Sequence, residues 1–483
     1  RRQRQMCIRD SYCLVSALTI KANGQDSLWK IQTTDYHGTY YGATVANGGI
    51  GILPWKEPFS IRHVMLNHVF DSATPQDVSR VLRGINPFNL QMQINGQTVN
   101  GDNISRWEQC IDMKEATHNT HFTCDGKADV SYSICALRNL PYAGLVRVEV
   151  VALGDMYLTV SNPIEIPDEY KNIGSKLVNV NVNGNDIKIV RTWALSKYRE
   201  QKVSASSAFI YDKNSSVQQQ YNGSGQISIS LKKGEKFFFT LLGAVCTGRD
   251  FIDPYNESDR EVIYGAKEGL TRLMDGHRKL WNEMWKGDIV IEGDDEAQRT
   301  VRFALYNLYS NARKGSRLSI PPFGLSSQGY NGHIFWDTEF WMYPPMLFMN
   351  QGIARTMMDY RTDRLEAACQ KALSYGYDGA MFPWESDDAG EEACPTWALT
   401  GPFEHHITAD IAIAAWNYYC MSGDQRWLRE EGFPLMEKVA EFWVSRVEKN
   451  DDGSYSIRNV VCADEYAAVS YTHLRAHETE ADL

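Results

Sequence analysis

The segment GHIFWDTEFWMYPP, residues 332–345, sets two carboxylates among five aromatic rings. Asp337 and Glu339 are the two acids, and Trp336 directly precedes the first of them. A charged group among apolar rings is costly unless another group pairs with it. Three partners are therefore open for these acids: a residue of the protein core, a metal ion, or a ligand that favours both rings and carboxylates.

Two later segments repeat this combination of acids and rings. The segment MFPWESDDAGEEACP, residues 381–395, carries Trp384, Glu385 and four further acids. The segment VVCADEYA, residues 460–467, places Glu465 between a short apolar run and a tyrosine. Glycoside hydrolysis needs a protonated carboxyl group on the leaving oxygen and a second carboxylate opposite it. Apolar neighbours raise the pKa of a carboxyl group, so Glu465 has the local chemistry of a general acid.

Simpler roles stay open for the same residues. Asp337 could cap the helix that follows it, and Glu339 could sit in the first helical turn, where a negative charge is favourable. The acids of residues 385–392 could form a solvated loop or a calcium site, although their spacing does not match an EF-hand. His405 and His406 are adjacent and point in different directions on a helix, with no HExxH motif beside them. No metal site is predicted.

The composition is that of a globular protein of two or three domains, with 483 residues, 43% of them hydrophobic and 23% charged. A net charge of −11 argues against nucleic acid as the main partner, because phosphate binding needs clustered lysine and arginine. No apolar run approaches the ~20 residues of a spanning helix, so no membrane partner is expected. The ten cysteines form no CxxC pair that would indicate a zinc or redox motif.

The two halves of the chain differ in periodicity. Between about residues 26 and 253, apolar and polar residues alternate, and Asn-Gly pairs at 95–96 and 183–184 are typical of hairpin turns. This pattern predicts a large antiparallel β-sandwich.

After this part of the chain, apolar residues recur at helical spacing. The helical segments are 259–285 (a linker helix), 295–313, 361–374, 408–420 and 434–448. They predict about half of a twelve-helix toroid whose long loops converge at one mouth.

Both ends of the chain look foreign to the rest. RRQRQMCIRDS and SYTHLRAHETEADL resemble translated sequencing-adaptor sequence. Just after the first of these, CLVSALTIKANGQ joins a short apolar run to Ala22 and Gly24, as in the tail of a secretory signal with its small-residue cleavage site. A first β-strand is the alternative. We therefore expect a periplasmic or secreted protein, or a cytoplasmic one if residues 13–24 are not a signal peptide.

Four motifs together carry a family resemblance. GHIFWDTEFWMYP, FPWESDDAGEEACP, EHHITADIAIAAWNYY and EFWVSRVE…DEY occur in the order found in glycoside hydrolase family 65. The sequence is most similar to its α-glucosidase branch, which includes acid trehalases and protein-glucosylgalactosylhydroxylysine glucosidases, and the likeness is strongest from about residue 331 to residue 466. The resemblance implies a multidomain protein of an N-terminal antiparallel β-sandwich, a helical linker and an incomplete (α/α)6 catalytic barrel.

The resemblance also divides the chain and assigns roles. The expected segments are 1–11 (adaptor-like), 12–24 (signal-peptide remnant), 25–253 (β-sandwich), 254–290 (helical linker), 291–468 (N-terminal half of the barrel) and 469–483 (adaptor-like). Trp336 and Asp337 fall on the FWD motif that holds a glucosyl unit, and Glu465 falls on the general acid of DEY. Trp384, Glu385 and His406, in the second and third motifs, are predicted to contact the same sugar.

The implied function is an inverting hydrolase that removes a terminal α-glucosyl residue from a disaccharide or glucosylated glycan, with no cofactor. One alternative is an inverting disaccharide phosphorylase of the same family, of the kojibiose, maltose or trehalose type, which would use inorganic phosphate. Another is a catalytically silent carbohydrate-binding fragment. Family members commonly continue DEY with His and an Asn-rich run, whereas Ala467 and Ala468 follow here. The expected general base or phosphate-binding region does not follow, and the linkage, aglycone and oligomeric state stay open.

Overall fold

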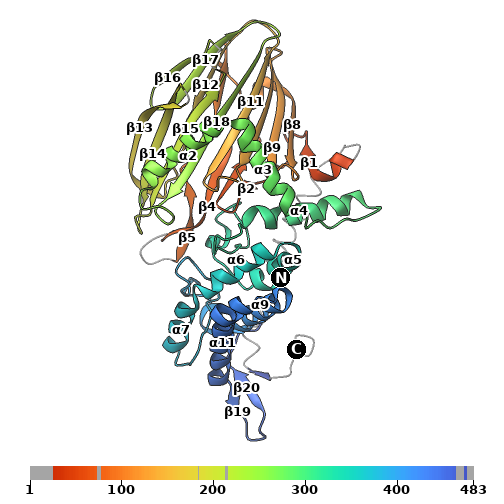
Figure 1. The fold of residues 1–483 in the computed structure, drawn as a ribbon, viewed down its shortest axis with the longest axis vertical. Helices are drawn as coiled ribbons and strands as arrows, with labels where there is room; N and C mark the ends of the chain where they lie inside the picture. The colour runs from red at the N-terminus through yellow and green to blue at the C-terminus, as the bar shows by residue number, and fades with distance from the viewer. Residues whose placement is uncertain (1–24, 73–77, 183, 213–215, 464–472, 476–483) are drawn as a thin grey trace.

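The computed structural model describes residues 25–72, 78–182, 184–212, 216–463 and 473–475. Figure 1 shows two parts, a large β structure made by the N-terminal half and a helical part made by the C-terminal half. The expected order, an antiparallel β domain followed by helices, is confirmed. The expected signal-peptide remnant and the N-terminal adaptor-like segment lie outside the described residues.

The β part is built from three antiparallel sheets. The nine-stranded sheet runs in the order β1 (Lys30–Thr33), β8 (Ile104–Asp112), β9 (Thr117–Cys124), β10 (Ala128–Ala136), β11 (Ala143–Ala152), β18 (Lys236–Thr247), β15 (Lys202–Tyr211), β14 (Asn185–Ser196) and β13 (Tyr170–Val182). The five-stranded sheet consists of β16 (Gln218–Tyr221), β17 (Gly225–Leu231), β12 (Met156–Asn162), β6 (Gln91–Ile94) and β7 (Gln97–Thr98). The four-stranded sheet consists of β2 (Val45–Ala46), β3 (Ile50–Pro54), β4 (Ile61–Ser72) and β5 (Ser79–Gly84).

Alternation along the strands builds the core of the sandwich. Val148 and Val150 on β11 and Leu158 and Val160 on β12 belong to one continuous buried cluster. The hairpin predictions are confirmed, because β13 pairs with β14 and β6 pairs with β7. Between β6 and β7 both turn residues have positive φ, 52° at Asn95 and 80° at Gly96, the conformation that Asn-Gly favours.

The predicted single linker helix is wrong, because two helices occupy that region. They are α2 (Pro254–Glu268) and α3 (Leu270–Met284). Gly269 separates them with φ 85° and ψ 150°, a conformation essentially restricted to glycine. The helical periodicity continues across the break, which is why the sequence pattern did not reveal it. Both helices lie across the outer face of the nine-stranded sheet (Figure 1).

The helical part matches the predicted periodicity in three places. Helices α4 (Asp295–Asn311), α9 (His406–Ser422) and α11 (Phe433–Arg446) fall on three of the predicted segments. The predicted helix over 361–374 is confirmed from Leu365 onward and is wrong at its start. Residues 361–362 end α6, which was not predicted, and a separate helix, α7, begins at Leu365. The other helices are α5 (Tyr343–Met349), α6 (Gln351–Thr362), α7 (Leu365–Ser374), α8 (Thr400–Phe403) and α10 (Gln425–Trp427).

Two wider turns interrupt the helical part, and each precedes proline. In η4 (Thr338–Met342) the N–H of Tyr343 donates to the carbonyl of Thr338, five residues back. Pro344 and Pro345 follow and have no N–H for the ordinary helical bond. The same pattern recurs at η5 (Leu428–Gly432), just before Pro434.

The remaining elements are short. They are η1 (Gln25–Trp29), η2 (Gly101–Asn103), η3 (Gly329–Gly332), and the strands β19 (Glu448–Lys449), β20 (Tyr455–Arg458) and β21 (His473–Arg475) of a small three-stranded sheet. Strand β21 falls in the segment expected to be adaptor-like, and that expectation stays a prediction. Among the described residues, no helix is both long enough and apolar enough to cross a membrane.

Candidate active site

Three of the predicted site residues form one aromatic cluster. The ring centroid of His406 lies 4.9 Å from that of Trp336 and 5.5 Å from that of Trp384, at interplanar angles of 86° and 73°. Both tryptophans are buried. His406 is the first residue of α9, so the start of that helix carries the ring between the two loops. The structure therefore brings together residues that are up to 70 positions apart in the sequence.

A short bridge between two loops fixes this arrangement. The N–H of Ile334 donates to the carbonyl of Ser386, and the N–H of Ser386 donates to the carbonyl of Ile334, both at 2.9 Å. The bridge lies two residues before Trp336 and two residues after Trp384. Asp337 and Glu385, which adjoin these tryptophans in the sequence, are consequently carried by the same pair of loops.

The acids of the second loop are mostly structural. Glu392 accepts hydrogen bonds from the backbone N–H groups of Trp384 and Glu385 at 2.9 and 3.0 Å. It also pairs with the ammonium group of Lys371. Glu391 is exposed. The reading of this loop as a solvated acidic stretch thus fits Glu391 but not Glu392, whose carboxylate holds the loop in shape.

Glu385 belongs to a buried polar chain that reaches the β domain. Its carboxylate lies 2.7 Å from Nδ1 of His333, and Nε2 of His333 lies 3.1 Å from the hydroxyl of Ser79 on β5. That hydroxyl donates to Asp387 at 2.8 Å. Arg199, also from the β domain, forms ion pairs with Asp387 and Asp388. The β domain therefore helps to hold the loop that carries Trp384 and Glu385.

The two acids of the first motif have different environments. Glu339 is completely buried and accepts hydrogen bonds from Nε and Nη2 of Arg361 at 2.8 and 2.7 Å. Burial raises the pKa of Glu339, while Arg361 opposes that shift. Asp337 is only half-buried, and its side chain makes no capping hydrogen bond to η4. Glu339 is therefore paired with a residue of the protein core, Arg361. Asp337 does not cap the helix that follows it.

His406 is held between two carboxylates. Its Nδ1 lies 2.7 Å from Asp410, and its Nε2 lies 3.1 Å from Glu404. Burial lowers the pKa of His406, but the two acids more than offset this effect and raise the pKa to about 9. The ring is therefore an imidazolium at neutral pH, and it supplies a positive charge beside the two tryptophans.

The neighbouring His405 is neutral and structural. Its Nε2 donates to the carbonyl of Pro402 at 2.9 Å, and its Nδ1 accepts from Arg446 at 3.2 Å. Burial lowers the pKa of His405 to about 4, and Arg446 acts in the same direction. Across the part of the chain that the structure describes, no group of three or more His, Cys, Asp or Glu side chains forms a candidate metal site.

Glu465 lies outside the described residues, so its predicted role is untested. The chain that leads toward it is described as far as Ala463. There the N–H of Val461 donates to the carbonyl of Phe403 at 3.0 Å, one residue before Glu404.

Several polar residues of the site were not predicted from the sequence. Glu404 and Asp410 could have been found, since they flank His406 at two and four positions in the EHHITAD segment. His333 also stands in the first motif. Ser79 and Arg361 come from a distant strand and another helix, and no pattern in the sequence connects them to the motifs.

Comparison with known proteins identifies relatives of both parts. The N-terminal domain of glycosyl hydrolase family 65 matches residues 42–284, and the central catalytic domain of that family matches residues 302–477. The kojibiose hydrolase of Flavobacterium johnsoniae is 43% identical over 436 residues, which are 89% of this chain and 64% of that protein. The kojibiose hydrolase of Mucilaginibacter mallensis is 37% identical over 462 residues, 94% of this chain and 68% of that protein.

Two further relatives are less extensive or more distant. The protein-glucosylgalactosylhydroxylysine glucosidase of Dictyostelium discoideum is 42% identical over 245 residues, 50% of this chain and 34% of that protein. A solved human-microbiome structure assigned as a kojibiose phosphorylase shares the fold, with a TM-score of 0.76 and 16% identity over 93% of this chain and 63% of that one. The chain thus spans about two thirds of the length of the two kojibiose hydrolases.

Proposed function

Because the chain belongs to glycosyl hydrolase family 65, we propose that the protein hydrolyses a terminal α-glucosyl residue, with inversion at the anomeric carbon. Kojibiose, the α-1,2-linked disaccharide of glucose, is the proposed substrate, since two relatives that align with most of this chain are named for it. The observation that carries the proposal is the meeting of Trp336, Trp384 and His406 at the bridge between the two motif loops.

The residues of this cluster suit a glucosyl unit. The faces of a pyranose ring are apolar and stack on an indole such as that of Trp336. Its hydroxyl groups donate well to a carboxylate, and Asp337 is half-buried beside that indole. The imidazolium of His406 can donate only through its ring N–H groups, both of which face carboxylates. We propose that His406 holds the two tryptophan rings in place and balances the negative charge of the site.

The proposed reaction uses two carboxyl groups on opposite faces of the sugar. Glu465 protonates the leaving glycosidic oxygen, while a carboxylate ~6.5–9.5 Å away activates the attacking water. Asp337 is a poor base because sugar hydroxyls occupy it, and Glu385 is engaged by His333. The base is therefore expected from a segment of the family's catalytic domain beyond Ala468.

One experiment distinguishes hydrolysis from the phosphorylase alternative. Kojibiose is supplied with and without inorganic phosphate, and the first products are followed by proton NMR before mutarotation. Hydrolysis with inversion gives β-glucose and the freed glucose unit whether or not phosphate is present. Formation of β-glucose 1-phosphate, only when phosphate is added, would instead assign the phosphorylase. Binding of kojibiose without turnover in either condition would favour the silent carbohydrate-binding fragment.

A further inference from the structure

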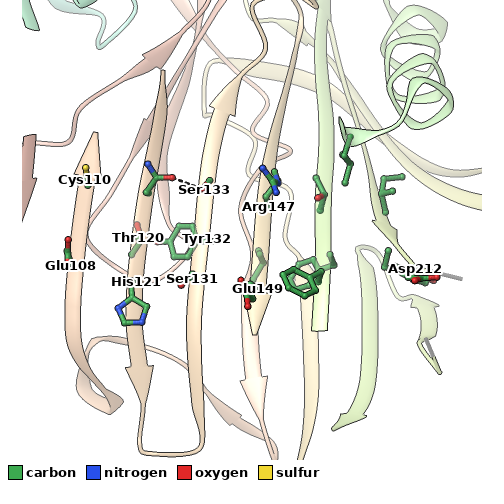
Figure 2. A pocket seen from close by; sticks show the side chains of 18 residues that line it. Glu108, Cys110, Thr120, His121, Ser131, Tyr132, Ser133, Arg147, Glu149 and Asp212 are labelled. Atoms are coloured by element: carbon green, nitrogen blue, oxygen red, sulfur yellow. Dashed lines mark hydrogen bonds between the residues drawn. The ribbon is translucent and has the colours of Figure 1, made fainter. Parts of the chain in front are cut away.

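The outer face of the nine-stranded sheet is hollowed into an open groove of about 750 Å³. Side chains of β8, β9, β10, β11, β18 and β15 line it, together with Leu270 at the start of α3 (Figure 2). This volume falls within the range of about 300–1,000 Å³ that is usual for ligand sites. The groove shares no residue with the aromatic cluster of the motif loops.

The groove is left uncovered because the outward-facing residues change from apolar to polar along β10 and β11. On β10 and β11, Cys135 and Leu145 face outward and are buried in a cluster with Leu273 of α3. The preceding outward pair across the same two strands is Ser133 and Arg147, and these line the groove. The sequence therefore provides an apolar half for the helices to cover and a polar half that they leave uncovered.

Phe238 is the most exposed apolar side chain that lines the groove. It lies on β18 directly opposite Glu149 of β11, and 56% of its surface is exposed. Among the described residues, no aromatic ring stacks on it. Burying an aromatic ring is strongly favourable, so a ring exposed in a polar groove offers a stacking surface to a ligand with an apolar face.

A straight row of four polar side chains crosses the sheet and ends at Phe238. The row consists of Glu108, His121, Ser131, Glu149 and Phe238, each paired with the next. Because neighbouring strands lie about 4.8 Å apart, the row is roughly 19 Å long. Figure 2 shows Glu108, His121, Ser131 and Glu149 along this line. The shape fits an extended chain of several units rather than one compact molecule.

The charge of the groove disfavours anionic ligands. Glu108, Glu149 and Asp212 contribute carboxylates, and Arg147 is the single basic side chain apart from His121 among the lining residues. The nearby Lys236 is already paired with Glu149 at 2.9 Å. Serine, threonine and asparagine side chains supply the remaining polar groups. Such a lining favours a neutral ligand rich in hydroxyl groups, because carboxylates accept hydroxyl hydrogen bonds strongly.

We propose that this groove is a second carbohydrate site, which binds a neutral oligosaccharide without cleaving it. The ring of Phe238 stacks on a pyranose face, and Glu108, Glu149 and Arg147 hydrogen-bond the hydroxyl groups. The site lies on the β domain and is independent of the linkage cleaved at the motif loops. Its role is to hold a glycan chain on the surface of the protein.

The test compares oligosaccharide binding by the whole chain and by surface variants, using calorimetry and saturation-transfer NMR. The probes are maltohexaose and cellohexaose as neutral chains and hexagalacturonate as an anionic one. Phe238→Ala should weaken binding of a neutral chain about tenfold, the loss expected for one stacked ring. Phe238→Tyr should retain binding. Tyr157→Ala is the matched control, because Tyr157 is also exposed on the sandwich but lies on β12, away from the groove.

Three results would overturn the proposal. They are no binding of either neutral chain at millimolar concentration, equal binding by the wild type and Phe238→Ala, and tighter binding of hexagalacturonate than of the neutral chains. Kojibiose cleavage is measured in parallel with the same substitutions in the protein extended to the length of its relatives. Phe238→Ala should leave it unchanged, so a failure of the groove and a failure of the proposed hydrolysis give different patterns.

Discussion

At the scale of single residues, Asp337 and Glu339 are two acids of one motif with different surroundings. Glu339 is fully buried against Arg361, whereas Asp337 is half-buried and makes no capping bond. Removing one partner of a buried ion pair leaves an uncompensated charge, which is strongly destabilising. The stability of the fold therefore depends on Glu339, while the half-buried Asp337 keeps its proposed role in binding the sugar.

We predict opposite effects for matched amide variants of these two acids. Glu339→Gln should lower the free energy of unfolding by about 3 kcal/mol, because Arg361 stays buried with its charge. Asp337→Asn should cost less unfolding free energy than Glu339→Gln, because Asp337 is only half-buried, and should weaken glucose-like inhibitors by roughly 1–3 kcal/mol. Urea titration and inhibition constants measure the two quantities. An unchanged inhibition constant for Asp337→Asn would remove Asp337 from the sugar site.

The raised pKa of His406 predicts how the stability of the protein depends on pH. Its pKa in the folded state is about 9, above the value near 6.5 in an unfolded chain. The folded state therefore binds this proton more tightly, and the stabilisation is complete below about pH 6.5 and is lost as the pH rises through about 9. Wild type should lose up to about 3 kcal/mol more unfolding free energy over that window than His406→Gln. Identical pH profiles for the two proteins would contradict the ion-paired geometry.

At the scale of elements, the periodicity of apolar residues predicted much of the secondary structure. Strand alternation and Asn-Gly turns located the hairpins, and helical spacing located α4, α9 and α11. The missed break at Gly269 and the wide turn before Pro344 depend on backbone geometry that the apolar pattern does not encode. In the same way, the motifs identified Trp336, Trp384 and His406, but the contacts of Ser79 and Arg361 arise only from tertiary packing.

Gly269 provides a direct test of the helix break. Its backbone adopts φ 85° and ψ 150°, and a Cβ built there would meet no atom within 4 Å. Gly269→Ala should therefore destabilise the fold by about 1–3 kcal/mol through backbone strain alone. Gly154→Ala is the control, because that glycine is equally unobstructed and does not have the left-handed conformation. Thermal unfolding of both variants measures the difference, and equal stabilities would show that α2 and α3 do not require the break.

At the scale of the whole molecule, the helices around the site expose apolar residues. Phe348, Trp416 and Val444 are 69%, 51% and 77% exposed. These large apolar side chains on α5, α9 and α11 offer contact surfaces to a partner. About a third of the length of each kojibiose hydrolase lies outside the part that this chain matches.

We expect residues 25–468 alone to be catalytically silent. They carry the proposed acid but not the expected base, and small misplacements of catalytic groups cost rate steeply. The assay is glucose release from trehalose, kojibiose, nigerose and maltose, with and without phosphate. Turnover that Glu465→Gln abolishes would instead place a base within these residues, and Glu385 or Glu391 would be the next to test.

The most direct test of the proposed mechanism is the turnover of kojibiose by Glu465→Gln in the protein extended to the length of its relatives. As the general acid, Glu465 should contribute ~10²–10⁴-fold to the rate, so the variant should lose that factor while its fold, followed by circular dichroism, persists. The loss should be smaller for an α-glucosyl fluoride, whose leaving group needs no proton. Near-normal kojibiose turnover by the folded variant would contradict the proposed mechanism.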